Sequence, residues 1–173
     1  MTENIASNIV NAFGDFGQTT LEKSIIVFLL SMLPIMEVKG SLIAAGMINL
    51  KPIIAFFVAV IGDLVPVPFL LMFLNKFFDF LRKHNKFTKV LNFFDRKVEK
   101  NKEKIIERGA MLGLILFVGI PVPGTGAWMG SLVASLMHLD KKKSFLGIFI
   151  GVIMTSTFMM LVSYGVLNSF LYK

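Results

Sequence analysis

Two acids and one lysine inside the apolar part of this 173-residue chain are the residues best suited to chemistry. Glu37 and Asp63 are the acids in apolar surroundings, and Lys39 follows two residues after Glu37. An ionised carboxylate in hydrocarbon costs at least about 3 kcal/mol, so each acid needs a partner, a proton or water. Because loss of water favours the neutral acid, either carboxyl group could bind a proton and couple it to transport.

Each acid also has a purely structural interpretation. Glu37 could form a static ion pair with Lys39. Asp63 could cap a helix, or accept a hydrogen bond from the backbone freed near Pro66. Intramembrane acids are functional by default, so we keep both interpretations and treat both residues as candidates for a site.

Two predicted helix starts could bind an anion. One follows Lys39 at Gly40, and the other follows the Gly124–Gly126 turn. Free N–H groups at a helix start favour anions, and a lysine adds a full positive charge. Two starts that meet would make a pocket for a phosphate or carboxylate, although the glycines could serve only to shape the turn. The candidate binding residues are therefore Glu37, Lys39, Gly40, Asp63, Gly124, Thr125, Gly126 and Trp128.

Composition indicates an integral membrane protein. The chain is 55% apolar with a mean hydropathy of +0.73, and 17% of its residues are charged, against about 25% in soluble domains. It has no cysteine and two histidines, which argues against thiolate or histidine-rich metal centres. The sequence shows no nucleophile–base pair and no phosphate-loop motif. We therefore expect no enzyme, no metal and no cofactor.

Four apolar stretches follow the N-terminal residues, and two of them are too short to cross a membrane unbroken. A hydrocarbon core needs about 20 helical residues, and the stretches 52–74 and 144–171 meet this length. Residues 25–33 and 109–120 span only about 14 and 18 Å. Each predicts half of a re-entrant hairpin, although one kinked helix is the alternative. The structural breaks are assigned to Pro34, Pro66, Pro68, Pro121 and Pro123.

The basic residues predict the topology. Eleven lie between Lys76 and Arg108, and Lys141–Lys143 follow the third stretch. Re-entry of that stretch places both basic segments on one side, which the positive-inside rule makes cytoplasmic. Both termini then lie outside the cytoplasm of a multi-pass cell membrane protein. The charge suits lipid headgroups, so we expect membrane lipids as partners and no nucleic acid.

A weak internal repeat accompanies these breaks. A shift of 89 residues pairs Gly62 with Gly151, and the same shift pairs Ala45 with Ala134 and Leu50 with Leu139. The predicted fold is all-α and integral to the membrane. It has two inverted repeats, each a re-entrant helical hairpin plus a transmembrane helix, joined by a basic amphipathic helical linker.

We expect a single membrane domain over residues 1–173. It divides into an N-terminal interfacial segment (1–22), repeat 1 (24–74), a cytoplasmic linker (75–108) and repeat 2 (109–171). Residues 1–22 lack the pattern of a signal peptide. The linker could sense lipids or simply set the topology. Spaced glycine pairs favour packing within the chain over a dimer seam, and a homodimer stays an alternative.

The segment Glu37-Val-Lys-Gly40 after Pro34, together with Pro121-Val-Pro-Gly-Thr-Gly-Ala-Trp-Met-Gly130, resembles the small multidrug export family. The resemblance covers residues 24–167 and extends distantly to the DedA/VTT superfamily of re-entrant, inverted-repeat membrane proteins. Those relatives imply lipid-linked transport. By motif, Glu37 matches the acid of the first hairpin, and Lys39 stands where relatives often have arginine. The arginine of the DedA-type second hairpin has no counterpart here.

The leading hypothesis is a small transporter or flippase, proton-coupled, for an anionic and lipid-phosphate-like substrate. Glu37 and Asp63 would handle the proton, while Lys39 and the Gly124–Gly126 turn would bind the anion. One alternative is export of cationic or amphiphilic drugs with the acids as counter-ions. Another is a membrane-shaping or assembly protein that acts through the linker.

Overall fold

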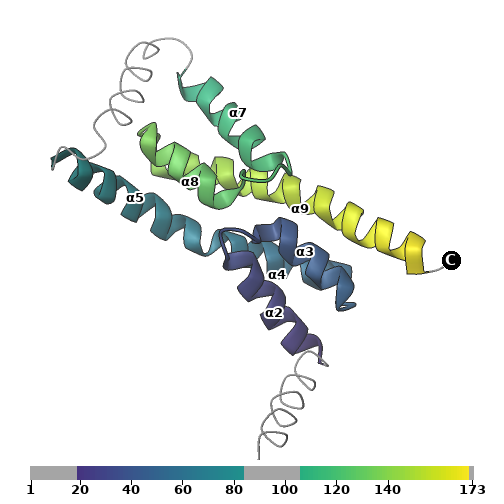
Figure 1. Cartoon of the computed structure of the whole chain (residues 1–173). Coiled ribbons are helices and arrows are strands. Elements are labelled where there is room, and N and C mark those ends of the chain that lie inside the picture. The colour runs from purple at the N-terminus through teal and green to yellow at the C-terminus, as the bar shows by residue number, and fades with distance from the viewer. Residues whose placement is uncertain (1–18, 84–105, 172–173) are drawn as a thin grey trace, which may run out of the picture.

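The computed structural model describes residues 19–83 and 106–171, and every regular element in these ranges is a helix (Figure 1). Most of the predicted N-terminal interfacial segment and most of the linker lie outside the described residues. The helices are α2 (Thr20–Met32), α3 (Glu37–Met47), α4 (Pro52–Leu64), α5 (Pro66–Lys83), α7 (Ile106–Gly119), α8 (Ala127–Leu136) and α9 (Lys141–Leu171).

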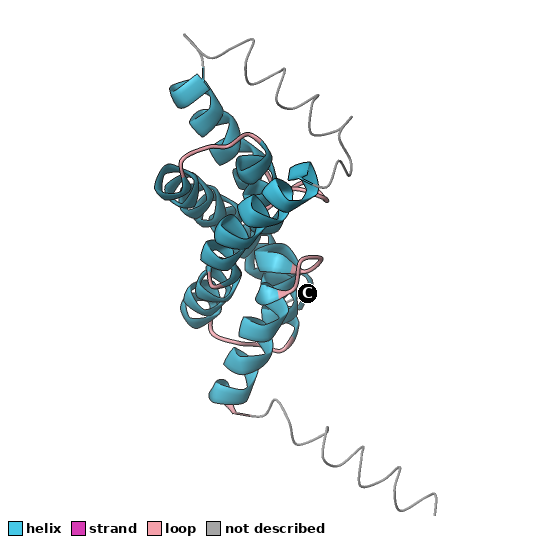
Figure 2. Ribbon diagram, turned by 90° about the vertical axis from the view of Figure 1, so that its left-hand side faces the viewer, coloured by secondary structure: helices cyan, strands magenta, loops and turns pink. Residues whose placement is uncertain are grey.

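Four short helices form two pairs, α2 with α3 and α7 with α8, and the members of each pair contact one another. In Figures 1 and 2 the pairs enter from opposite ends of the molecule, and their breaks lie near its middle. Helix α2 begins earlier than residue 24 because Thr19 and Glu22 form a capping box, with N–O distances of 3.1 and 3.2 Å. It ends before Pro34, where Leu33 is extended.

Two longer segments run alongside these pairs. Residues Pro52–Leu74 and Lys141–Gly165 are long and apolar enough to cross a membrane. The first comprises α4 and the start of α5, which meet at Val65 just before Pro66. The second begins three residues before the predicted stretch, because the Asp140 carboxylate accepts the backbone N–H of Lys143 at 2.9 Å.

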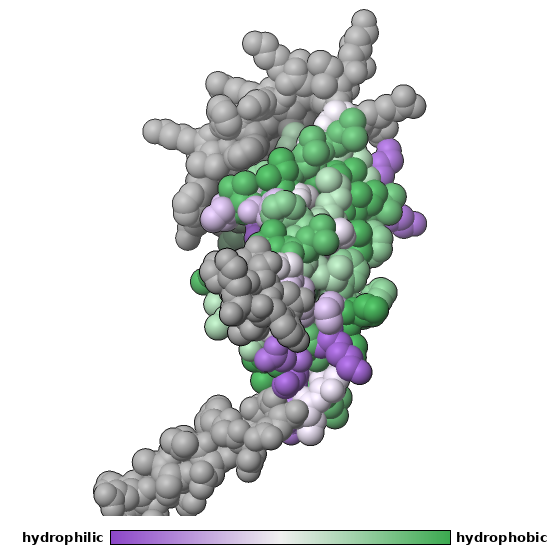
Figure 3. Space-filling model, turned by 90° about the vertical axis from the view of Figure 1, so that its right-hand side faces the viewer, coloured by the Kyte–Doolittle hydropathy of each residue, from purple (hydrophilic) through white to green (hydrophobic). Residues whose placement is uncertain are grey.

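Helix α9 contacts α3, α4, α7 and α8 and therefore holds both halves of the chain together. Three side chains of α9 donate to carbonyl oxygens of other segments. Thr155 reaches Val118 at 2.6 Å, Ser163 reaches Leu42 at 2.8 Å, and Tyr164 reaches Leu50 at 2.7 Å. The outer surface is mainly apolar on the face shown in Figure 3, with hydrophilic residues gathered in a few patches.

Residues 89 positions apart have matching roles in the two halves. A Cβ atom on Gly62 would overlap the Ser31 hydroxyl of α2, and one on Gly151 would lie 2.6 Å from Val118 of α7. Each glycine thus lets one of the two segments of spanning length approach the first helix of a pair. Helices α3 and α8 also end alike: Asn49 and His138 have φ of 54° and 52°. In both cases the backbone N–H of the next residue donates to the carbonyl oxygen five residues earlier in the chain, at 2.9 and 3.0 Å.

Candidate functional site

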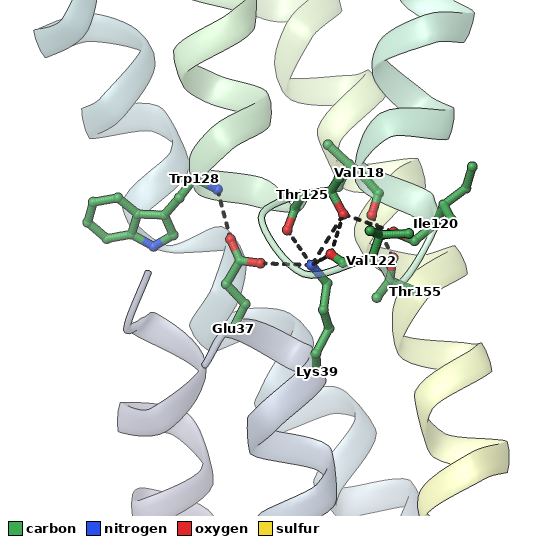
Figure 4. Close-up of polar contacts among 8 residues, drawn as sticks. All are labelled: Glu37, Lys39, Val118, Ile120, Val122, Thr125, Trp128 and Thr155. Atoms are coloured by element: carbon green, nitrogen blue, oxygen red, sulfur yellow. Dashed lines mark hydrogen bonds and ion pairs between the residues drawn. The ribbon is translucent and has the colours of Figure 1, made fainter. Parts of the chain in front are cut away.

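Glu37 lies where the break of the first pair ends and α3 begins. Its φ is 47°, a left-handed conformation that costs a non-glycine residue energy, and it is only 4% exposed. The carboxylate reaches across to the second pair, where Oε1 accepts the backbone N–H of Trp128 at 3.2 Å (Figure 4). Trp128 is the second residue of α8, so a negative charge sits at a helix start whose N–H groups have no intrahelical acceptor.

Lys39 also contacts the second pair, but as a donor to carbonyl oxygens. Its ammonium donates to the carbonyl oxygen of Val122 at 2.9 Å and to that of Thr125, both in the break after α7. It also lies 3.5 Å from Glu37 Oε2. The Thr125 hydroxyl is directed at two further acceptors, the carbonyl oxygens of Ile120 and Val122, at 3.0 and 2.8 Å. A cation and a hydroxyl therefore satisfy the carbonyl groups left free where α7 ends.

The Trp128 indole of the second pair forms a hydrogen bond to the first pair. Its Nε1–H donates to the carbonyl oxygen of Met32, the last residue of α2, at 3.2 Å. Each pair thus caps carbonyl groups at the break of the other, Lys39 in one direction and Trp128 in the other. Such reciprocal capping suits broken helices inside a membrane, where water cannot solvate the free backbone groups.

Gly126 has no room for a side chain at this junction. Its φ is 135°, which disfavours every other residue, and a Cβ atom would overlap the Glu37 carboxylate. Gly124 also has a left-handed φ of 82°, but a Cβ atom there would meet nothing within 4 Å. The Gly124–Gly126 turn therefore shapes the break, and its second glycine also admits the carboxylate.

Asp63 lies next to this junction without bonding to it. It is 1% exposed, and neither of its carboxylate oxygens has a hydrogen-bond partner among the described residues. The N–H of Val38 lies nearby but outside hydrogen-bond geometry, and Glu37 and Lys39 are both within electrostatic range. Asp63 therefore belongs to the same charged cluster, as the acid whose oxygens remain unbonded.

The structure thus brings together Glu37, Lys39, Thr125, Gly126 and Trp128, with Asp63 at their edge. The predicted helix start at Gly40 is wrong, because α3 begins at Glu37 and Gly40 is its fourth residue. A Cβ atom on Gly40 would meet Met36 Sδ at 2.6 Å. The arrangement differs from the expected open anion pocket. In this conformation the Glu37 carboxylate takes the helix-start N–H, and carbonyl oxygens take the lysine donors.

Two sequence expectations for structural roles gain detail here. The ion pair between Glu37 and Lys39 is present, but it forms part of a larger junction. Asp63 neither caps a helix nor bonds the backbone near Pro66. The carbonyl acceptors of Met32, Val122 and Thr125 escaped sequence reasoning, because a backbone oxygen carries no residue signature. Within the described ranges, no cluster of three or more His, Cys, Asp or Glu could hold a metal ion.

Comparison with curated proteins finds no match, and comparison with solved structures finds none either. Residues 37–158, more than two thirds of the chain, match the model of a family described as "Putative small multi-drug export protein". The match begins at Glu37 and includes Asp63 and the whole second break. With its two apolar helices of spanning length, this is a membrane protein, and the chain belongs to the small multi-drug export protein family.

Proposed function

We propose that this protein is a membrane transporter that couples export to proton movement, with Asp63 and Glu37 as the groups that bind the proton. One observation carries the proposal: Asp63 is buried beside Glu37 and Lys39 with both oxygens unbonded within the described part of the chain. A buried charge without hydrogen bonds is costly, so this carboxyl group calls for a proton or a positively charged ligand.

The charges of the cluster support one exchangeable proton. Two acids and one lysine sum to one negative charge when all three are ionised. A single proton on either acid makes the cluster neutral, which favours its burial in a low-dielectric interior. A cationic substrate that displaced the proton would leave the same total charge. Exchange of a proton for a cationic drug could therefore drive export of the drugs that the family description names.

We further propose that each helix pair is a re-entrant hairpin and that the two halves form an inverted repeat. The paired helices have 10 to 14 residues each, or about 15 to 21 Å, and a hydrocarbon core is about 30 Å thick. The matching helix ends at Asn49 and His138 and the matching glycines Gly62 and Gly151 support the repeat. The capped breaks would then meet at mid-membrane.

Single cysteines test this topology, since the chain has none of its own. In the proposed arrangement Lys76 and Lys141 label from the cytoplasmic side, while Asn49 and Thr19 label from the other. Labelling of positions 76 and 141 from opposite faces would show instead that α7 and α8 cross the membrane as one kinked helix.

Transport would proceed by rocking of one half against the other. The contacts of Glu37, Lys39 and Trp128 join the two hairpins, so they describe a closed junction that must open to let a substrate pass. Opening would expose the acids and the lysine to one side of the membrane. This scheme needs no chemical step on the substrate, so we propose a transporter and no enzymatic activity.

A second candidate is transport of an anionic substrate such as a phosphate or a lipid phosphate. The observation in its favour is that Lys39 and the N–H of Trp128 converge on one small region. In the closed junction both donors are occupied, so the anion would have to replace the Glu37 carboxylate. Substitution of Lys39 should then abolish transport of the anion, whereas a cation exporter should depend on the acids.

The test is reconstitution in liposomes with an imposed pH gradient, with proton flux followed by a trapped pH indicator in the presence of cationic or anionic candidate substrates. Asp63→Asn should abolish substrate-driven proton flux, because an amide cannot take up and release the proton that the buried carboxyl group would carry. Asp140→Asn is the matched control, because Asp140 is exposed at a helix cap where Asn serves equally well. Full proton coupling in Asp63→Asn would refute the proposal.

A further inference from the structure

A groove between α5 and the start of α9 forms a second candidate binding site, and it shares no residue with the charged junction. Its volume is about 350 Å³, within the range of small-ligand sites. Helix α5 contributes Pro68, Leu71 and Met72, and α9 contributes Lys141, Lys142 and Phe145. We propose that this groove binds one anionic phospholipid, with its phosphate at the two lysines and an acyl chain along the apolar wall.

The lining divides into two parts that match such a lipid. Lys141 and Lys142 are exposed, and neither has a carboxylate within ion-pair distance in the described part of the chain. The remaining lining is apolar, and Met72 and Phe145 are 56% and 36% exposed. A free phosphate would use only the lysines and an uncharged lipid would use only the wall, so a lipid with an anionic headgroup uses both.

The position of the lysines along the helices fits the depth of a headgroup. Lys141 begins α9, one of the two segments of spanning length, and Phe145 follows one turn later on the same face. On α5, Pro68 lies eight residues before Lys76, so the wall descends about 12 Å from that basic residue. The groove thus runs from a basic end of the molecule into its apolar part.

The start of α9 does not by itself bind the phosphate. Asp140 already accepts the backbone N–H of Lys143, which leaves recognition of the phosphate to the two ammonium groups. Lysines near a membrane surface each strengthen binding of anionic lipid by about fivefold, so the pair should contribute about 25-fold. Neutral variants of the two lysines should lose that factor and keep the contact with the acyl chain.

Native mass spectrometry of the full chain in detergent, titrated with dioleoyl phosphatidylglycerol or dioleoyl phosphatidylcholine, tests the proposal. We expect one phosphatidylglycerol to bind in preference to phosphatidylcholine. Lys141→Gln/Lys142→Gln should weaken that binding about 25-fold. Lys23→Gln/Lys51→Gln, which removes two lysines of other segments that do not line the groove, should leave it unchanged. Equal loss in both double variants would reduce the site to general surface charge and overturn the proposal.

A groove-filling variant distinguishes binding of a whole lipid from binding of its phosphate alone. Met72→Trp keeps both lysines but fills the wall, and it should weaken binding of phosphatidylglycerol. Glycerophosphoglycerol, which is the phosphodiester headgroup of phosphatidylglycerol without acyl chains, should fail to compete at equal concentration. Effective competition, unchanged binding in Met72→Trp, or a dimer mass in place of the lipid adduct would each overturn the assignment of this groove to one lipid.

Discussion

Replacement of Lys39 by methionine should reveal how strongly the two hairpins depend on their charged junction. The side chain keeps its length but loses the ammonium that donates to Val122 and Thr125. It also leaves Glu37, which is 4% exposed, without its cation. Removal of one partner from a buried ion pair typically costs about 3–5 kcal/mol, so we expect a loss of that size in the free energy of unfolding.

The double variant Glu37→Gln/Lys39→Met should be more stable than Lys39→Met alone. It leaves no uncompensated charge, and the glutamine oxygen can still accept the N–H of Trp128 at the start of α8. The remaining loss comes from carbonyl groups of the second break and should be about 1–3 kcal/mol. Recovery of stability on adding a second substitution would distinguish a buried charge pair from a simple packing contact.

The assay is unfolding of the purified protein in mixed detergent micelles, followed by far-ultraviolet circular dichroism, because helix loss reports directly on an all-helical chain. Lys51→Met is the matched control, since Lys51 is exposed at the start of α4 and should change stability by no more than about 0.5 kcal/mol. A cost for Lys39→Met no larger than for Lys51→Met, or a double variant weaker than either single one, would refute the reasoning.

Five further substitutions, two of them controls, probe how the helices pack at this junction and along α9. Gly126→Ala should lower the thermal stability for two reasons. Backbone strain at its positive φ costs about 1–3 kcal/mol, and the Cβ atom also displaces the buried Glu37 carboxylate, so we expect a larger total loss in thermal unfolding. In the same assay Gly62→Ala should destabilise through overlap with α2, whereas Gly113→Ala, with open space around it, should stabilise by up to about 1 kcal/mol. Thr155→Val should cost about 1 kcal/mol for its lost bond to α7, while Thr157→Val, which bonds only within its own helix, should be neutral.

The broken helices were predictable because chain length and proline act locally. Residues 25–33 and 109–120 are too short to span whatever surrounds them, and Pro34 and Pro121 stop a helix from within the chain. The start of α2 also follows from local sequence, since Thr19 and Glu22 have the spacing of a capping box. Local chemistry therefore sets the ends of these helices.

The partners at the junction were less predictable because they come from distant parts of the chain. Glu37 and Lys39 are two residues apart, so their pairing could be anticipated. The bond from Trp128 to Met32 joins residues 96 positions apart and ends on a backbone oxygen, which no residue type signals. The environment of Asp63 likewise depends on how α4 packs. The flippase activity, the DedA likeness, the absence of enzymatic activity and the partners stay predictions.

The junction links the proposed proton binding to the proposed opening. Glu37 holds the second hairpin through its charge, because an ionised acceptor bonds about twice as strongly as a neutral one. A proton on Glu37 would neutralise the cluster and, at the same time, weaken the bonds to Trp128 and Lys39 that keep the junction closed. Asp63, buried without bonds of its own, could hold the proton while Glu37 keeps the junction closed. Transfer of one proton between the two acids would then suffice to release the hairpins.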